Sequence, residues 1–425
     1  MIYANEYGFL PGKDAEENAR ALQAAVDRGG EILIGEPGVY SLSEPIVIGD
    51  DTTLRFAEGV KILREPSRSG KNGNAFINRG AFAREWNRNI AIYGLHMECN
   101  GVESARVLPG WRAQVGFMFI ENLTLCDITI TGLLEKDYGI QLAFFKNAVM
   151  EDLFIEGNKD GVHLGPGSDF AIRRGKFRTF DDPIALNAYD FSSSAPVIGT
   201  IENGVIEDCY DLDAEDTTGY FCRMPSGMWV DWYEGVRVAH SSTVVSDGYI
   251  YRVVMKPDGT YYESKDRPCH GLGEKSYPDG INWMGIQAGS ETGCACKNIA
   301  FRRCHLQKKR GAAFACEWFV GKWARSYMKG GTAIPHSGIV LEDITIENTV
   351  DKLFSSNAPI SDLSIRNTDL GASKVFLTGY TGFDGEEFIG LDYPECEVRL
   401  ENCKNAKQNL IINEPASANV NITEV

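Results

Sequence analysis

Two segments decide the fold of this 425-residue chain: Asn158-Lys159-Asp160-Gly161-Val162-His163-Leu164 and Asp181-Asp182-Pro183-Ile184-Ala185-Leu186-Asn187. Both contain a tripeptide made of an outward residue, Gly or Pro, and an apolar residue. The tripeptide also occurs at Tyr138-Gly139-Ile140, so the steps 160 − 138 and 182 − 160 are both 22 residues. A constant step of this size indicates a solenoid whose repeats stack on one another. Residues one step apart should then lie about 4.8 Å apart.

This spacing brings three acidic residues together. Asp160 and Asp182 are one step apart and Asp181 adjoins Asp182, so the three carboxyl groups should share one small, exposed patch. Like charges raise one another's pKa, which makes such a cluster unfavourable. Folding alone gives little reason for the cluster, and the three aspartates are therefore candidate catalytic residues.

Short apolar triplets with period-two alternation recur along the chain. They are too short and too β-branched for helices. Examples are Ile128-Thr129-Ile130, Leu153-Phe154-Ile155, Phe170-Ala171-Ile172, Ile344-Thr345-Ile346 and Leu363-Ser364-Ile365. Repeated strands without intervening helices exclude a βαβ fold. The sequence predicts an all-β protein, a right-handed parallel β-helix.

The period fails at two places, near the N-terminus and in the second half of the chain. Residues 14–28 read as an amphipathic helix ended by Gly29-Gly30, within an N-terminal cap of residues 1–30. A helix there would cover an open sheet edge. We expect one β-helix domain over residues 1–425, with an inserted region at 224–283 near the active-site face. Within it, a hairpin around Pro257-Asp258-Gly259 is predicted.

Charge and composition limit the functional classes. The net charge of −17 argues against nucleic acid as a partner, because phosphate binding needs clustered Lys and Arg. No stretch approaches the roughly 18 apolar residues that span a bilayer. An odd number of cysteines, eleven, favours a reducing compartment over a disulfide framework. With no signal peptide visible, a cytoplasmic location is the expectation, although a secreted protein trimmed of its leader would look the same.

The two motifs resemble those of the polygalacturonases, family 28 of the glycoside hydrolases, in the pectin-lyase-like superfamily. Asn158-Lys159-Asp160-Gly161 is similar to the family's Asn-Thr-Asp-Gly, and Phe180-Asp181-Asp182-Pro183-Ile184-Ala185-Leu186 to its Gly-Asp-Asp-Cys-Ile-Ala-Ile. The resemblance extends over much of residues 1–210. It implies a hydrolase that degrades cell-wall polysaccharide by inversion. Asp181 would be the general acid, and Asp160 and Asp182 would hold and deprotonate the attacking water.

The departures from the family concern substrate binding. The family's Gly-His-Gly histidine falls at Thr218, and its Arg-Ile-Lys falls at Gln287 and Gly289. The Lys that ends the Asp-Asp strand is replaced by Asn187. Basic side chains there would grip the carboxylate of galacturonate, so their loss predicts a different or neutral sugar. The candidate substrate-binding residues are Asn158, His163, Gln141, Asn187, Thr218, Gln287, Arg310 and Trp283.

Three functions compete. The first is an exo-acting glycosidase that cleaves a plant or microbial polysaccharide fragment, with an oligosaccharide or polysaccharide as its partner and no cofactor. The second is a β-helix polysaccharide lyase, which would need Ca²⁺ or another means of acidifying the substrate, together with an Arg or Lys as the base. The third is a non-catalytic carbohydrate-binding β-helix. A metal site at Cys294-Ala295-Cys296 is disfavoured, because both sulfurs would face one side of a strand as a packed interior needs. The sugar, the linkage and the oligomeric state stay open.

Overall fold

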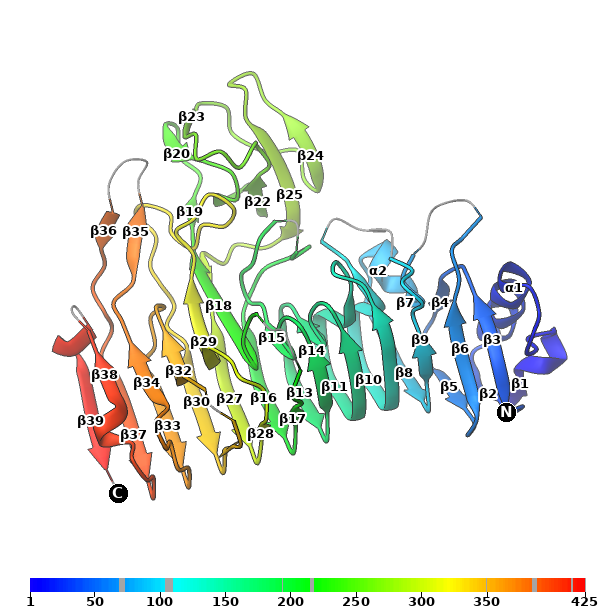
Figure 1. Cartoon of the computed structure of the whole chain (residues 1–425). Helices are drawn as coiled ribbons and strands as arrows, with labels where there is room; N and C mark the ends of the chain where they lie inside the picture. Colours follow the sequence, from blue (N-terminus) through cyan, green and yellow to red (C-terminus); the bar gives the residue numbers. More distant parts are fainter. Residues whose placement is uncertain are drawn as a thin grey trace.

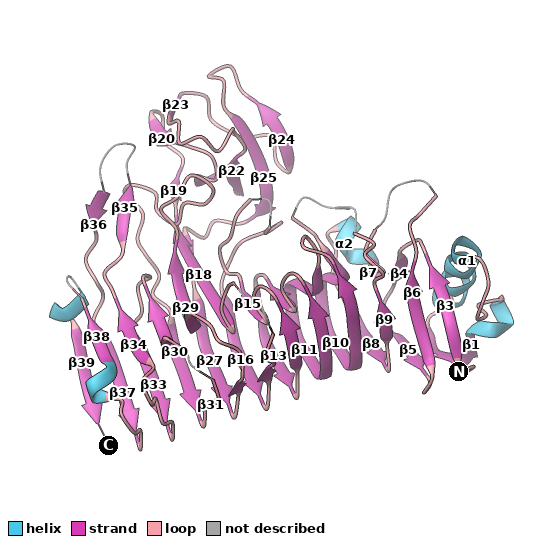
Figure 2. Cartoon of the chain, viewed as in Figure 1, coloured by secondary structure: helices cyan, strands magenta, loops and turns pink. Residues whose placement is uncertain are grey.

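The chain winds into one long solenoid of stacked coils, with the N-terminus at one end and the C-terminus at the other (Figure 1). The computed structural model describes residues 1–68, 73–103, 110–192, 194–214, 218–348, 350–383, 388–413 and 416–424. Strands in neighbouring coils pair in parallel and form one large sheet wound into a right-handed β-helix. Strands dominate the chain and helices are few (Figure 2). The predicted fold class is confirmed.

The pairings arrange the strands in three rows along the solenoid. The first row comprises β4 (Ile46–Ile48), β7 (Phe76–Asn78), β12 (Val162–Leu164), β15 (Ile184–Leu186), β18 (Cys222–Met228), β29 (Ala312–Trp318), β32 (Lys352–Ser356), β34 (Lys374–Leu377) and β38 (Leu410–Ile412). The second comprises β1 (Ile2–Tyr3), β2 (Gly30–Ile34), β5 (Thr52–Phe56), β8 (Asn87–Tyr93), β13 (Gly167–Arg173), β16 (Ile201–Glu207), β27 (Cys296–Arg302), β30 (Ser337–Glu342), β33 (Asp362–Arg366), β37 (Cys396–Glu401) and β39 (Val420–Glu424).

The third row is shorter. It comprises β3 (Gly38–Leu42), β6 (Val60–Arg64), β9 (His96–Glu98), β14 (Lys176–Thr179), β17 (Tyr210–Asp211), β28 (His305–Leu306) and β31 (Thr345–Ile346). Two long strands, β10 (Ala113–Leu133) and β11 (Tyr138–Gly157), bend through all three rows. The 22-residue step is confirmed here, because Ile140 pairs with Val162 and Val162 pairs with Ile184.

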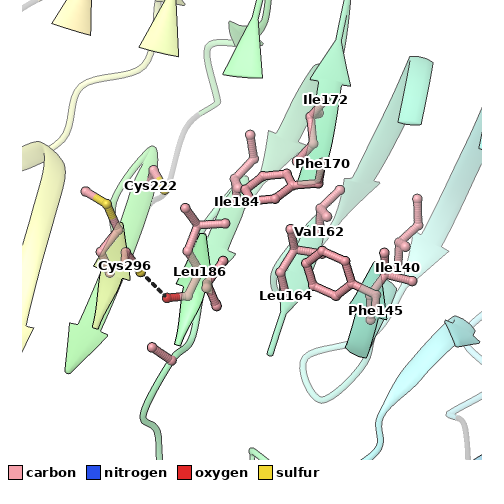
Figure 3. Packing of buried hydrophobic residues seen from close by; sticks show 14 of the residues in the cluster. Ile140, Phe145, Val162, Leu164, Phe170, Ile172, Ile184, Leu186, Cys222 and Cys296 are labelled. Atoms are coloured by element: carbon pink, nitrogen blue, oxygen red, sulfur yellow. Dashed lines mark hydrogen bonds between the residues drawn. The ribbon is translucent and has the colours of Figure 1, made fainter. Parts of the chain in front are cut away.

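The interior of the solenoid is a continuous apolar core. Side chains of equivalent positions, such as Ile140, Val162 and Ile184, stack from coil to coil (Figure 3). Cysteines belong to this core: Cys294 and Cys296 are fully buried, and the Cys296 thiol donates to the Leu186 carbonyl at 3.4 Å. This packing confirms the structural interpretation of the Cys-x-Cys sequence. All eleven cysteines are free thiols.

A helix covers the N-terminal end as predicted. The helix α1 runs over Ala15–Val26, and the Asp14 carboxylate caps it by accepting the N–H groups of Glu16 and Glu17 at 3.0 and 3.2 Å. An Asp at this position satisfies N–H groups that have no partner within the helix. The remaining helical pieces are α2 (Arg79–Ala83) and the 3₁₀ turns η1 (Ala4–Tyr7), η2 (Lys407–Asn409) and η3 (Ala416–Ala418). No helix in the described ranges has the length and apolar character needed to cross a membrane.

The insertion stands out from the solenoid above β18 (Figure 1). It holds a sheet ordered β19 (Val230–Asp231), β21 (Thr243–Ser246), β22 (Tyr249–Val253), β25 (Asn282–Ala288) and β24 (Gly273–Ser276), and a pair of β20 (Val236–Val238) and β23 (Tyr262–Ser264). β26 (Gly293–Cys294) returns the chain to the solenoid, while β35 (Thr381–Phe383) and β36 (Phe388–Gly390) form a separate hairpin.

Two details of the predicted insertion are wrong. The hairpin joins β21 to β22 around Asp247-Gly248, and the strand at Tyr262 pairs with β20 instead. The bounds also shift, because β18 remains paired in the solenoid as far as Ser226 and β25 continues the insertion sheet to Ala288. The Pro-Asp-Gly signal marks a turn, but the strand partners are chosen by burial of the aromatic and β-branched side chains, which a local signal does not report.

Candidate active site

The three predicted aspartates lie together just before strands of the first row. Asp160 precedes β12, and Asp181 and Asp182 precede β15. The register that pairs Val162 with Ile184 sets Asp182 directly beside Asp160 and Asp181 beside Lys159. One carboxylate oxygen from each aspartate lies within 4.8 Å of the others. The solenoid thus brings residues from two coils into one acidic cluster, as the spacing predicted.

Asp160 is held as an ionised carboxylate. It is 2% exposed, and its Oδ2 lies 2.9 Å from Nδ1 of His163. Burial, the largest influence, acts to raise the pKa of Asp160, but the hydrogen bond with His163 and the nearby Lys159 and Arg223 outweigh it and keep this pKa below its ordinary value. The His163 ring stacks on Tyr138 at 4.1 Å between centres. Asn187 Nδ2 lies 2.9 Å from His163 Nε2, so the ring is fixed on three sides.

Asp182 has the opposite electrostatic character. It is 2% exposed, and burial together with the charge of Asp160 raises its pKa to about 7, against the opposing charge of Arg223. The Tyr220 N–H donates to its Oδ1 at 2.7 Å, and Arg223 Nε lies 3.3 Å from Oδ2. Asp160 and Asp182 are therefore a pair of adjacent carboxyls in which one is ionised and the other carries a proton near neutral pH.

Asp181 is the most accessible member of the cluster. Its side chain is 17% exposed and forms a close ion pair with Lys159 of the preceding coil. Gly219 packs directly against Asp181 and Asp182. A Cβ atom at position 219 would stand only 2.4 Å from Oδ1 of each of them. The prediction that all three carboxyl groups are exposed is therefore wrong for Asp160 and Asp182. Gly219, the Tyr220 N–H and the Arg223 side chain lie against Asp182, and the His163 ring lies against Asp160.

Arg223 joins the cluster to a second set of acidic groups. Its Nη2 donates to Asp190 Oδ2 at 3.0 Å and to Asn187 Oδ1 at 3.1 Å, and Nη1 lies 3.8 Å from Glu317. It pairs in register with Ala185, the residue above His163. With Asn187 bonded to both His163 and Arg223, the position where the resembled family has Lys serves as a neutral link between the two.

The remaining predicted substrate-binding residues divide into two groups. Asn158 and Thr218 are exposed, and Asn158 lines a hollow of about 510 Å³ with Arg178 and Phe180. Four others are buried and already bonded or packed: Gln141, Gln287, Arg310 and Trp283. Their side chains are engaged within the protein, which assigns them to the structure and not to a substrate.

Each of the four has a structural role. Gln141 bonds to the backbone of Gly110 and Arg112, and Gln287 bonds to both backbone groups of Ile198. Arg310 is paired with Asp211 at 2.6 Å. Trp283 packs inside the insertion sheet, where it pairs with Val253. Gln287 also lies in this antiparallel sheet, so the expected alignment of residues 284–290 with a solenoid coil is wrong.

Three further residues of the cluster, Lys159, Asp190 and Tyr138, were not among the predicted site residues. Lys159 and Tyr138 are each 22 residues before Asp181 and Asp160, so the same period contained the signal. Asp190 and the bonding of Arg223 had no such signal, because the coil between Ile184 and its partner Cys222 is 222 − 184 = 38 residues long.

The three aspartate oxygens are close enough to share a cation. Lys159 and Arg223 already contact two of the three carboxyls, so a metal ion would have to compete with both. A second group, Cys126 with Glu151 and Asp152, has its carboxylates paired with Arg173 and Arg174. The donor sets do not favour a metal at either place.

No family model matches the sequence, and neither does any curated protein. Solved structures do. The family 28 exopolygalacturonase of Yersinia enterocolitica is similar over 100% of this chain and 78% of its own, with a TM-score of 0.52 at 12% identity. The A-module of the mannuronan C-5 epimerase AlgE4 of Azotobacter vinelandii is similar over 100% of this chain and 95% of its own, with a TM-score of 0.53 at 11% identity. The N-terminal fragment of gene product 12 of bacteriophage Phi29 is similar over 100% of this chain and 66% of its own, with a TM-score of 0.51 at 12% identity. At such identities the likeness shows the fold alone, which is the parallel β-helix that the sequence predicted.

Proposed function

We propose that this chain is a glycoside hydrolase whose catalytic groups are Asp160, Asp181 and Asp182. The observation that carries the proposal is the stacking of Asp160 on Asp182 at two buried positions. Two adjacent buried carboxyls are unfavourable for folding. They are useful for proton transfer, because the ionised member can accept a proton while the protonated member supplies one.

The reaction needs one acid and one base. A water molecule attacks the anomeric carbon and loses a proton to an ionised carboxylate, while a protonated carboxyl gives its proton to the leaving glycosidic oxygen. Asp160 has the charge of the base, and the pKa of Asp182 near 7 keeps a proton available. Asp181 has the exposed side chain and is the member that reaches the substrate oxygen.

Lys159 determines when Asp181 can act as the acid. Its ammonium group contacts the Asp181 carboxylate, and a nearby cation favours the ionised form. A substrate that moves Lys159 away would allow Asp181 to take up the proton that Asp182 holds. The resembled family has Thr at this position, so this step would be particular to the present chain.

The carboxyl separation bears on stereochemistry. Inverting hydrolases usually hold their carboxyl groups about 6.5–9.5 Å apart so that water fits between them. The nearest oxygens here lie within 4.8 Å, so an attacking water would sit beside the cluster and not between opposed groups. We propose inversion with this placement of water, and the anomer of the first product decides it.

The insertion supports an exo mode of action. It rises from β18, the first-row strand that follows β15, and stands beside the solenoid wall (Figure 1). A wall at one end of a binding groove would admit only the end of a polysaccharide chain.

A substrate screen tests the proposal. Purified protein is incubated with neutral and acidic oligosaccharides and aryl glycosides, and the anomers of fresh product are followed by NMR. Hydrolysis of at least one substrate is expected, and Asp181→Asn should lower its rate by about 10²–10⁴-fold or more because a general acid is lost. The matched control is Asp169→Asn, an exposed aspartate with a left-handed backbone in β13 of the same solenoid, which should keep the parent rate.

Other outcomes would replace the proposal. An unsaturated product with chelator sensitivity would identify a lyase. Saturable binding that leaves every oligosaccharide intact, and that survives all three Asp→Asn changes, would identify a non-catalytic binding protein. Near-normal turnover in Asp181→Asn would remove this residue from the mechanism.

Substrate preference gives a second test. Around the cluster, Asn187 is a buried neutral amide and Thr218 a neutral exposed residue where the resembled family has a basic residue and a histidine. A missing charge-assisted hydrogen bond forfeits roughly 1.5–3 kcal/mol. We therefore expect neutral glycosides to be cleaved faster than oligogalacturonides. Efficient cleavage of oligogalacturonides alone would contradict this preference while leaving hydrolysis itself intact.

A further inference from the structure

A second cavity, separate from the aspartate cluster, lies between the insertion and the solenoid. Its volume is about 470 Å³, which is within the range of small-molecule sites. Its walls come from distant parts of the chain: Met118 of β10, Phe191 and Pro196 of the segment after β15, Met284 and Ile286 of β25, and Trp323. Trp323 is 55% exposed and gives the cavity an aromatic rim. These residues form a largely apolar enclosure.

One cation in this cavity is buried without an acidic partner. Arg252 of β22 is 1% exposed, and its Nη2 donates to the Asp190 carbonyl at 2.7 Å. Among the residues that the structure describes, its Nε and Nη1 have no hydrogen-bond partner. The guanidinium lies 5.0 Å from the centre of the Tyr189 ring, which covers one face. A guanidinium stays protonated and offers five N–H groups, so two of its nitrogens remain available.

The rest of the lining adds positive and neutral groups. Arg84 donates from Nη1 to the Ile286 carbonyl at 2.8 Å and so ties the end of α2 to the insertion. His240 lies 3.4 Å from the Ser192 hydroxyl; burial and the charges of Arg252 and Arg325 lower its pKa, which keeps the ring neutral at pH 7. Among the described residues that line the cavity there is no Asp or Glu. An unpaired buried charge is strongly unfavourable unless something pairs with it.

We propose that this cavity binds a small organic carboxylate with an aromatic or other apolar body. The carboxylate would accept a charge-assisted hydrogen bond from one of the two unpartnered nitrogens of Arg252, because the N–H groups of Nε and Nη1 point to different sides of the guanidinium. The apolar body would lie against Met118 and Met284, with its outer end on Trp323. A free sugar acid does not fit as well, because its hydroxyls would be enclosed by side chains that offer few hydrogen bonds.

The site is linked to the aspartate cluster through a single residue. Asp190 accepts from Arg252 with its backbone oxygen and from Arg223 with its carboxylate, and Arg223 contacts Asp182. The occupant can therefore be an acidic aryl or acyl group carried by a saccharide, or a free acid that alters the cluster. Binding to Arg252 does not depend on the aspartates being catalytic.

Titration calorimetry on the full chain tests the site, with 3-phenylpropionate as the probe. The uncharged 3-phenylpropionamide tests the need for the carboxylate, and galacturonate tests the need for an apolar body. We expect 3-phenylpropionate to bind at least tenfold more tightly than either. Arg252→Met should weaken its binding at least tenfold. The matched control is Arg64→Met, which removes another buried arginine, in β6 and outside the cavity, and it should leave the affinity unchanged.

Trp323→Ala keeps the test valid if Arg252→Met does not fold. The Trp323 side chain is exposed, so its removal should spare the fold and weaken binding of 3-phenylpropionate several-fold. No binding of 3-phenylpropionate to the parent protein would overturn the proposal. Equal affinity for the amide would also overturn it, as would an affinity that neither Arg252→Met nor Trp323→Ala changes. Galacturonate binding as tightly as 3-phenylpropionate would overturn the assigned ligand class.

Discussion

The same solenoid contains two charged columns built in opposite ways. In the second row, one column of paired residues alternates in sign from coil to coil: Glu151, Arg173, Glu207, Arg302, Glu342, Arg366 and Glu401. Arg173 forms ion pairs with both of its neighbours in this column, at 2.9 Å from Glu151 and 2.7 Å from Glu207. In the first row, the register instead places Asp160 next to Asp182.

The difference shows that stacking of like charges is not imposed by the fold. Where coils need only be held together, the charges alternate at partly exposed positions. Where Asp160 meets Asp182, both are buried, and His163, Lys159 and Arg223 are gathered around the cluster to offset the repulsion. An arrangement that lowers the free energy of unfolding in this way is expected at a functional site. The following variants test this difference between the two columns.

The largest effect on stability is expected from Arg223→Met. This change leaves the carboxylate of Asp190 buried without its cation, and loss of one partner of a buried ion pair costs about 3–5 kcal/mol. The free energy of unfolding, measured with urea, should fall by that amount. The control is Arg302→Met in the alternating column, whose side chain is 41% exposed, and it should cost less than about 1 kcal/mol. If the free energy of unfolding fell equally in the two variants, burial would not be what makes the charges of the two columns differ in their contribution to stability.

The second prediction concerns pH. The pKa of Asp182 is about 7 in the folded chain and near its ordinary 3.8 when unfolded. Between these values the folded state binds more protons, so the free energy of unfolding should decrease as pH rises from about 4 to 7. The slope contributed by this group approaches roughly 1.4 kcal/mol per pH unit.

Asp182→Asn should remove that slope, because an amide does not ionise. Urea unfolding at pH 5 and pH 8 compares the two proteins, and the change between the two pH values is the readout. The lowered pKa of Asp160 acts in another window: its stabilisation is lost only as pH falls below about 4. Parallel pH curves for parent and variant would contradict a protonated Asp182.

The sequence predicted those parts of the site that obey the 22-residue step. The pairing of Ile140, Val162 and Ile184, the meeting of Asp160 with Asp182 and the bond between His163 and Asn187 all follow from that period together with alternation along a strand. A regular backbone repeat converts sequence separation directly into distance.

The sequence did not predict what covers and neutralises the site. Arg223 reaches it across a coil of a different length, and Gly219 closes over it with a left-handed backbone, φ 67°. Trp283 and Gln287 belong to an insertion in which antiparallel partners are set by side-chain packing. Their chemical type suggests sugar binding, but burial depends on contacts between distant segments, which no local pattern encodes.

The smallest effect is expected from rebuilding a like-charge stack on the surface. Arg302→Glu would place three glutamates in succession, Glu207, the new residue and Glu342, in the alternating column. Because the side chain of Arg302 is 41% exposed, water screens the repulsion, and a loss of about 1 kcal/mol or less is expected from urea unfolding. Ionic strength of 1 M shortens the screening length to about 3 Å and should remove most of that loss. The pH-dependent cost of Asp182 should persist in the same salt, since a buried pair is screened much less. If salt instead removed both effects alike, exposure would not be what distinguishes the two columns, and the aspartate stack would have to be accessible to solvent.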